Sequence, residues 1–287
     1  MFHEQIFEVQ GKSINAAVGP NNGPALLMLH GVTRRWQTFV PLLPALSTRF
    51  EVFAFDYLGH GKSDRTHRSY RVIDYVETMT ELLMHPPFST QKKIYLYGHS
   101  LGSMIAAALA GRFAQKVEAV VMEDPPFQTM GKRIETTPLL SYFNGLSEFA
   151  GASDAPTALA KRIADMRVID PHSQQTTRLG DTRDAASLLF TAKSLAQLDP
   201  RVFDSILSGQ WLDGFDVESV LAAIQCPALL LQADWLAGGM LTNEDAQRAV
   251  TLMRQASHIR MEGVGHLIHW LRTEQLLRYV QAFLESV

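Results

Sequence analysis

The sequence predicts an α/β fold in which a mainly parallel central sheet is flanked by helices. Short continuous apolar runs, typical of strands covered on both faces, alternate with longer segments of helical periodicity. The 287 residues, 46% of them hydrophobic, suffice to bury a large core. Since strand–helix alternation implies right-handed crossovers, most of the strands should be parallel.

The predicted elements follow in order along the chain. "FEVQ" and "SINAAV" predict an opening hairpin around Gly11 and Lys12. The expected strands of the sheet then span 25–30, 50–56, 93–98, 117–124, 228–234 and 258–263. The expected helices between most of them span 37–47, 70–84, 101–112, 243–254 and 268–285.

One long connection breaks this alternation. From Pro125 to Cys226 no strong strand pattern appears, whereas 155–168 and 184–198 carry apolar residues at helical spacing. In "LDPRVFDSIL", Asp199 as N-cap and Pro200 at the first helical position predict a further helix.

The simplest interpretation of this connection is a helical cap inserted between two strands, over one end of the sheet. The expected division is a core of 1–125 and 227–287 and a cap with its connection at 126–226. A helical layer packed against the sheet edge is the alternative.

Composition excludes several classes of function. The net charge of −3 does not suggest a nucleic-acid partner, and the single cysteine allows no internal disulfide. The N-terminus lacks the apolar core of a signal peptide, and no apolar run reaches the length of a membrane span. We therefore expect a cytoplasmic protein without membrane or nucleic-acid partners.

The stretch "YLYGHSLGSM" places Ser100 where a predicted strand becomes an alanine-rich helix. Such a tight turn forces strained backbone angles on its central residue, and Gly98 and Gly102 give the strand and helix room to approach. The serine should project from the carboxyl edge of the sheet. The Leu101 amide, at the helix N-terminus, should point toward an oxygen bound there.

In this context the chain resembles the α/β-hydrolase superfamily over nearly its whole length. The motifs are "LHGVT" (29–33), "DYLGHGKSD" (56–64), "GHSLG" (98–102) and "GVGHLIHW" (263–270). The resemblance implies the α/β-hydrolase fold and a Ser–acid–His triad with Ser100 as nucleophile. "DYLGHGKSD" is interpreted as a structural loop that shapes one wall of the site.

The resemblance also implies the base and the oxyanion hole. His266 follows the last strand on a glycine-flanked loop, where the superfamily keeps its base. The residue after His-Gly, Val32, supplies the second oxyanion amide beside Leu101. The competing histidines are expected to be structural, with the His99 side chain directed away from the site; they are His30, His99 and His269.

The acid of the triad has three candidates. Asp124 stands at the end of strand 117–124, where some members of the superfamily keep the acid, and we choose it by alignment of the strand ends. Asp234 stands at the strand that usually carries the acid, but Ala233 replaces the usual glycine and Asp234 comes one turn too early. Glu123 is the third candidate, although strand alternation should direct it and Asp124 to opposite sides, so that only one can serve.

Substrate contacts are less defined by the sequence. Trp36 and the pair Arg34 and Arg35 stand just behind the oxyanion loop. One of these arginines, with Arg34 the choice, could bind a carboxylate of the substrate. Solvent exposure of these side chains is the alternative. Apolar residues that could line the site or form the core of the cap are Met130, Phe143, Phe149, Phe190 and Trp211.

Together these features predict a serine hydrolase that cleaves an ester, lactone, amide or activated C–C bond of a small molecule through an acyl-enzyme. We expect no metal or cofactor, and a monomer or homodimer. Two alternatives stay open: a cofactor-independent dioxygenase on the same fold, and a non-catalytic small-molecule-binding protein.

Overall fold

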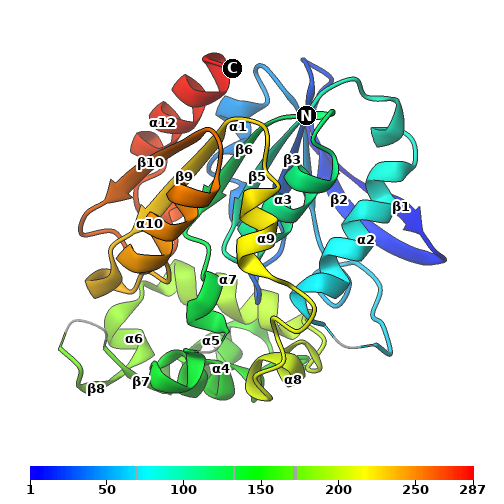
Figure 1. Cartoon of the computed structure of the whole chain (residues 1–287). Helices are drawn as coiled ribbons and strands as arrows, with labels where there is room; N and C mark the ends of the chain where they lie inside the picture. Colours follow the sequence, from blue (N-terminus) through cyan, green and yellow to red (C-terminus); the bar gives the residue numbers. More distant parts are fainter. Residues whose placement is uncertain (69, 132, 171–172) are drawn as a thin grey trace.

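The computed structural model describes residues 1–68, 70–131, 133–170 and 173–287. Its centre is an eight-stranded sheet of order β1-β2-β4-β3-β5-β6-β9-β10 (Figure 1). Only the pairings of β2 with β1 and with β4 are antiparallel, so the prediction of a mainly parallel sheet is confirmed. The strands are β1 (His3–Val9), β2 (Lys12–Val18), β3 (Ala25–Leu29), β4 (Glu51–Phe55), β5 (Ile94–His99), β6 (Val117–Glu123), β9 (Ala228–Ala233) and β10 (Ala256–Met261).

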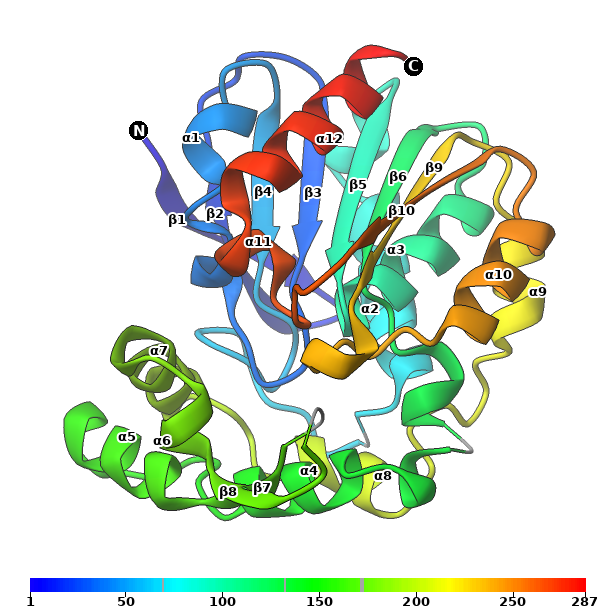
Figure 2. The ribbon, with the colours of Figure 1, turned by 90° about the vertical axis from the view of Figure 1, so that its left-hand side faces the viewer.

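Helices cover both faces of the sheet (Figure 2). In β3, Leu26 and Met28 face one buried cluster while Leu27 and Leu29 face the other, which explains its continuous apolar run. On one face lie α1 (Leu43–Leu46), α11 (Ile268–Leu271) and α12 (Thr273–Glu285). On the other lie α2 (Val72–Met84), α3 (Leu101–Arg112), α9 (Val217–Ala222) and α10 (Asn243–Leu252).

Between β6 and β9 the chain forms a separate group, which we call the inserted helices, at the carboxyl ends of the parallel strands (Figure 2). They are α4 (Leu139–Ser147), α5 (Pro156–Asp165), α6 (Leu179–Thr182), α7 (Ala185–Ala196) and α8 (Val202–Leu207). The connection returns to the core through α9, which packs against α3.

Several elements differ from the predictions in their bounds. The helix expected at 37–47 is a 3₁₀ turn, η1 (Trp36–Phe39), followed by the short α1, because Pro41 and Pro44 lack the amide protons a continuous helix needs. The helix expected at 268–285 is two helices, which Arg272 separates. The other 3₁₀ turns are η2 (Phe88–Thr90), η3 (Phe127–Met130), η4 (Ile134–Thr136) and η5 (Trp235–Ala237).

The connection between β6 and β9 also differs in detail from the prediction. It contains a small antiparallel hairpin, β7 (Arg167–Ile169) and β8 (Thr176–Arg178), whose strands are too short to show a strand pattern. Asp199 does not cap α8, which begins at Val202. Its carboxylate accepts hydrogen bonds from the Tyr70 hydroxyl at 2.8 Å and the Arg201 amide at 3.1 Å.

No helix in the described part of the chain combines the length and the apolar character that crossing a bilayer requires.

Candidate active site

Ser100 lies in a strained turn between β5 and α3, with φ 55° and ψ −118°. Glycine is required on both sides of it. A Cβ on Gly98 would lie 2.2 Å from the Gly102 carbonyl oxygen, and one on Gly102 would lie 1.8 Å from the Leu29 carbonyl oxygen. Backbone strain of this kind costs about 1–3 kcal/mol and clusters at functional sites. The strained backbone that the flanking glycines predict for Ser100 is therefore present in the structure.

The loop after β3 packs directly against this turn. A Cβ on Gly31 would lie 3.1 Å from the Ser100 Cβ, so the loop and the serine are in close contact. The Arg34 amide donates to the Gly31 carbonyl at 3.1 Å, which closes a turn that contains Val32. Since α3 begins at Leu101, the Leu101 amide belongs to the first helical turn, whose N–H groups lack helical partners. The predicted oxyanion donors thus come from two segments that meet at Ser100.

His266 is paired with Asp124 from the end of β6. Its Nδ1 lies 2.6 Å from Asp124 Oδ2, and the carboxylate is fully buried while 14% of the imidazole side chain is exposed. Three further donors hold this carboxylate, namely the amides of Ala233 (3.0 Å), Met240 (2.8 Å) and Leu241 (3.2 Å). An anionic carboxylate so held fixes an imidazole with Nδ1 protonated and leaves Nε2 as the basic atom.

Asp234, the alternative acid, has a different set of contacts. It is the N-cap of η5, where it accepts from the Leu236 amide at 3.0 Å. Its other oxygen accepts from the Gly263 amide at 2.9 Å, at the start of the loop that leads to His266. The hydrogen bond of His266 Nδ1 goes to Asp124 rather than to this carboxylate.

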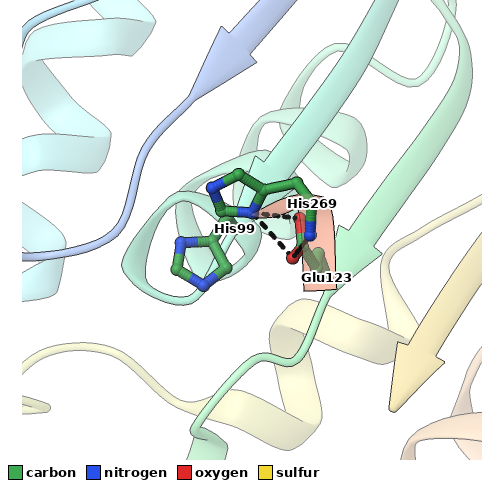
Figure 3. A group of neighbouring side chains, drawn as sticks. All are labelled: His99, Glu123 and His269. Atoms are coloured by element: carbon green, nitrogen blue, oxygen red, sulfur yellow. Dashed lines mark hydrogen bonds and ion pairs between the residues drawn. The ribbon is translucent and has the colours of Figure 1, made fainter. Parts of the chain in front are cut away.

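Glu123, the third candidate acid, forms a second carboxylate–histidine pair with His269 (Figure 3). The His269 Nδ1 lies 2.8 Å and 3.0 Å from the two carboxylate oxygens, and the His269 amide donates to one of them at 2.9 Å. The Tyr97 hydroxyl donates to the same carboxylate at 2.5 Å. On the other side, His269 Nε2 lies 2.8 Å from Thr38 Oγ1. Sequence reasoning found both residues but missed their pairing.

His99 joins the two pairs, which corrects the expectation that it points away from the site. Its Nε2 lies 3.0 Å from the main-chain oxygen of His266, and its ring centroid is 4.6 Å from that of His266 and 4.8 Å from that of His269. Burial above all, and then the two neighbouring histidines, lower the pKa of His99 well below its usual value. His99 is therefore neutral, and its Nε2–H donates to the main-chain oxygen of His266 and so supports the His266 loop.

His99, Glu123 and His269 are residue types that bind metals, and in the described part of the chain they offer three ligand atoms within 4.8 Å of one another. Protein groups already occupy most of these atoms. Both Glu123 oxygens accept hydrogen bonds, both His269 nitrogens have polar neighbours, and His99 Nε2 contacts the His266 main-chain oxygen, which leaves only the buried His99 Nδ1 without a partner among the described residues. The geometry therefore favours a hydrogen-bonded cluster over a metal site.

The structure separates the two predicted substrate contacts. The Trp36 indole is directed toward β1, where its Nε1 donates to Glu4 Oε1 at 3.0 Å. The Arg34 guanidinium instead reaches the inserted helices, where its Nη1 donates to Thr191 Oγ1 at 2.9 Å. Asp56, in the loop interpreted as structural, accepts from the Trp36 amide at 2.8 Å and from Asn15 Nδ2 at 2.9 Å.

Comparison with known proteins identifies the family. The family model of the alpha/beta hydrolase fold matches residues 24–273. The chain belongs to this family. The match includes the Ser100 turn, the loop after β3, Asp124 and His266.

Individual relatives of this α/β-hydrolase-fold protein match it in part or at low identity. It is 34% identical over 103 residues to 2-(acetamidomethylene)succinate hydrolase of Mesorhizobium japonicum, a match that covers 36% of each chain. It is 35% identical over 101 residues to an uncharacterised protein of Mycobacterium tuberculosis, which covers 35% of this chain and 29% of that one. The matches to these curated relatives thus span about a third of their length.

Solved structures resemble the whole fold. The N-formylmaleamic acid deformylase of Pseudomonas putida S16 superposes with a TM-score of 0.75 at 18% identity, covering 97% of this chain and 100% of that one. A carboxylesterase of Bacillus subtilis superposes with a TM-score of 0.70 at 19% identity, covering 100% and 93%. At these identities the likeness concerns the fold alone.

Proposed function

We propose that this protein is a serine hydrolase that cleaves an ester, lactone, amide or activated C–C bond of a small molecule. The observation that carries the proposal is the 2.6 Å contact between His266 Nδ1 and Asp124 Oδ2, beside a serine held in a strained strand-to-helix turn. A serine hydroxyl is a weak nucleophile at neutral pH and needs such a base next to it.

In the proposed reaction, Ser100 Oγ attacks the acyl carbon while its proton passes to His266 Nε2. The carbonyl electron pair moves to the oxygen, which the amides of Val32 and Leu101 stabilise; loss of one such donor costs about 10² to 10³ in kcat. Collapse of this intermediate breaks the bond to the leaving group, which takes the proton from His266. Water then attacks the acyl-enzyme, gives a proton to His266, and releases the acid as Ser100 regains its hydrogen.

The backbone supports this assignment. Positive φ angles occur at Ser100 (55°), the proposed nucleophile, at Asp124 (44°), the partner of the proposed base, and at Thr33 (67°), in the proposed oxyanion loop. Among the described residues no hydrogen bond joins Ser100 Oγ to His266 Nε2. Such contacts are often long in a ligand-free enzyme and tighten when substrate binds.

The inserted helices are proposed to act as a cap that closes over the substrate and sets specificity. They lie at the carboxyl edge of the sheet, where open α/β sheets bind ligands (Figure 2). The similar proteins with named activities include hydrolases of amides and esters, which supports a small acyl substrate. Arg34 is proposed to contact that substrate, and contact with Trp36 stays a prediction.

Labelling with a fluorophosphonate probe tests the proposal, together with hydrolysis of p-nitrophenyl hexanoate. We expect the wild type to be labelled and Ser100→Ala to lose both labelling and hydrolysis. Ser103→Ala is the matched control, because Ser103 lies one helical turn away and donates its hydroxyl to the Gly98 carbonyl. An unlabelled wild type that hydrolyses no ester would contradict the proposal and favour a binding protein.

Hydrolysis in an oxygen-depleted buffer separates the proposal from the dioxygenase alternative. A hydrolase keeps its rate without oxygen, because water is the only co-reactant. A rate that depends on oxygen and persists in Ser100→Ala would instead indicate proton abstraction by the Asp124–His266 pair.

A further inference from the structure

Arg34 carries a positive charge from the oxyanion loop to the inserted helices. Its Nη1 donates to Thr191 Oγ1 of α7 at 2.9 Å, and its guanidinium lies 5.7 Å from the centroid of the Phe190 ring. A guanidinium has five N–H donors, and the described hydrogen bonds of Arg34 use one of them. Thr191 and Phe190 thus hold the guanidinium in place, and most of its N–H donors are available to bind a ligand.

Among the described residues this charge has no counter-ion. In the described part of the chain neither Arg34 nor Arg183, which stands just before α7, forms an ion pair, although both are half-buried. Burial lowers the pKa of Arg34 most; the negative charge of an ionised Tyr142 raises it, and the positive charge of Arg183 lowers it. The positive charge of Arg183 thus acts on Arg34 and repels it.

Several other arginines of the inserted segment have carboxylate partners. Arg162 pairs with Asp154 at 3.0 Å, and Arg201 pairs with Asp199 at 2.7 Å. Removing a guanidinium from water without a carboxylate is costly, and that cost is recovered when an anion binds between two such groups. The contrast points to an anionic ligand for Arg34 and Arg183.

The position of Arg34 relates this ligand to the chemistry. Arg34 is two residues beyond Val32, the proposed oxyanion donor, so their Cα atoms are at most about 7 Å apart. A molecule with its acyl carbon at Ser100 and a carboxylate some bonds away can reach both groups. Arginine binds carboxylates through two parallel N–H···O bonds, which also orients the bound molecule.

We propose that Arg34 and Arg183, with the hydroxyl of Thr191, bind a second, uncleaved carboxylate of the substrate. The substrate class is then an anionic acyl compound: an ester, lactone or amide that carries a free carboxylate. This inference rests on the proposed function, since it takes Ser100 as the site of attack. It assigns specificity to two arginines from opposite sides of the substrate, one on the core and one on the inserted helices.

A pair of esters of equal chain length tests the inference. The mono-p-nitrophenyl ester of adipate is anionic, and p-nitrophenyl hexanoate is its neutral counterpart. We expect the ratio of their kcat/KM values, anionic over neutral, to fall at least tenfold in Arg34→Gln and in Arg183→Gln. Arg162→Gln, an arginine that already has a carboxylate partner, should keep the wild-type ratio. Circular dichroism checks that each variant is folded.

Protection of Ser100 gives the same comparison without turnover. Millimolar adipate should slow fluorophosphonate labelling of the wild type, and Arg34→Gln should need at least tenfold more adipate for equal protection, while hexanamide should not distinguish the two. Equal ratios and equal protection in all variants would overturn the inference and leave the serine hydrolase intact. Absence of both labelling and ester hydrolysis in the wild type would overturn the proposed function, and the inference with it.

Discussion

Two consecutive residues at the end of β6 form two carboxylate–histidine pairs with different surroundings. Asp124 pairs with His266, and Glu123 pairs with His269, which lies three residues after His266. The first histidine is partly exposed, and within the described part of the chain its Nε2 has no hydrogen-bond partner. The second is fully buried and has polar neighbours at both ring nitrogens.

The difference shows that residue type alone does not define a catalytic pair. A general base needs a ring nitrogen that substrate can reach, and His266 retains one. The two ring nitrogens of His269 contact Glu123 and Thr38. These contacts connect α11 to η1 and to the end of β6. In the proposed function, catalysis therefore falls to the Asp124 pair and support of the His266 loop to the Glu123 pair.

The largest expected effect separates the two pairs by activity. In Asp124→Asn the side-chain amide offers a proton donor to His266 Nδ1 and favours the wrong tautomer, so kcat should fall roughly 10⁴-fold. Steady-state hydrolysis of p-nitrophenyl hexanoate measures this. A loss below tenfold in a folded variant would show that His266 does not depend on Asp124.

Glu123→Gln should separate the pairs by stability. The isosteric amide removes a buried charge that accepts from Tyr97 and His269, so the free energy of unfolding should fall by about 3 kcal/mol. The loosened His266 loop should lower kcat about tenfold. Urea denaturation and steady-state kinetics measure the two effects, and Tyr97→Phe, which removes one donor only, serves as the milder control. A kcat loss as large as that of Asp124→Asn would contradict the division of roles.

His60, a buried histidine without a carboxylate hydrogen-bonded to its ring in the described part of the chain, should make the stability of the fold depend on pH. Burial lowers the pKa of His60 from 6.5 to about 4. Because the unfolded chain then binds the extra proton between these values, stability is complete above pH 6.5 and is lost as the pH falls toward 4. At pH 5 this group should cost about 2 kcal/mol of unfolding free energy. Urea denaturation of the wild type and His60→Phe at pH 7.5 and pH 5 should show a weaker pH dependence in the variant, and an unchanged dependence would contradict this account.

The sequence was most informative where local backbone rules apply. Glycines on both sides of Ser100 and a carboxylate at a strand end follow from the conformation of a few neighbouring residues. The structure accordingly brings Ser100, Asp124 and His266 to one edge of the sheet. The same rules missed the break of the helix expected at 37–47, because the apolar periodicity was given more weight than Pro41 and Pro44.

Pairings across long sequence distances were beyond such rules. Glu123 and His269 are 146 residues apart, and only the packing of α11 beneath β5 and β6 brings them together. Likewise, the contact of Arg34 with Thr191 spans 157 residues and depends on how the inserted helices return over the sheet. Nothing in the local composition of these segments distinguishes a buried pair from two exposed residues.

The smallest expected effect concerns Asp234, the carboxylate one strand away from Asp124. In Asp234→Asn the new side chain still caps η5, because asparagine is as good an N-cap as aspartate. The charge that favours the Gly263 amide is lost, so the free energy of unfolding should fall by about 1 kcal/mol. The kcat should stay within about twofold of the wild type, as is usual away from reacting groups. Measured beside Asp124→Asn, this variant decides between the two acids: a loss of several orders of magnitude in Asp234→Asn alone would move the catalytic carboxylate from the end of β6 to the end of β9.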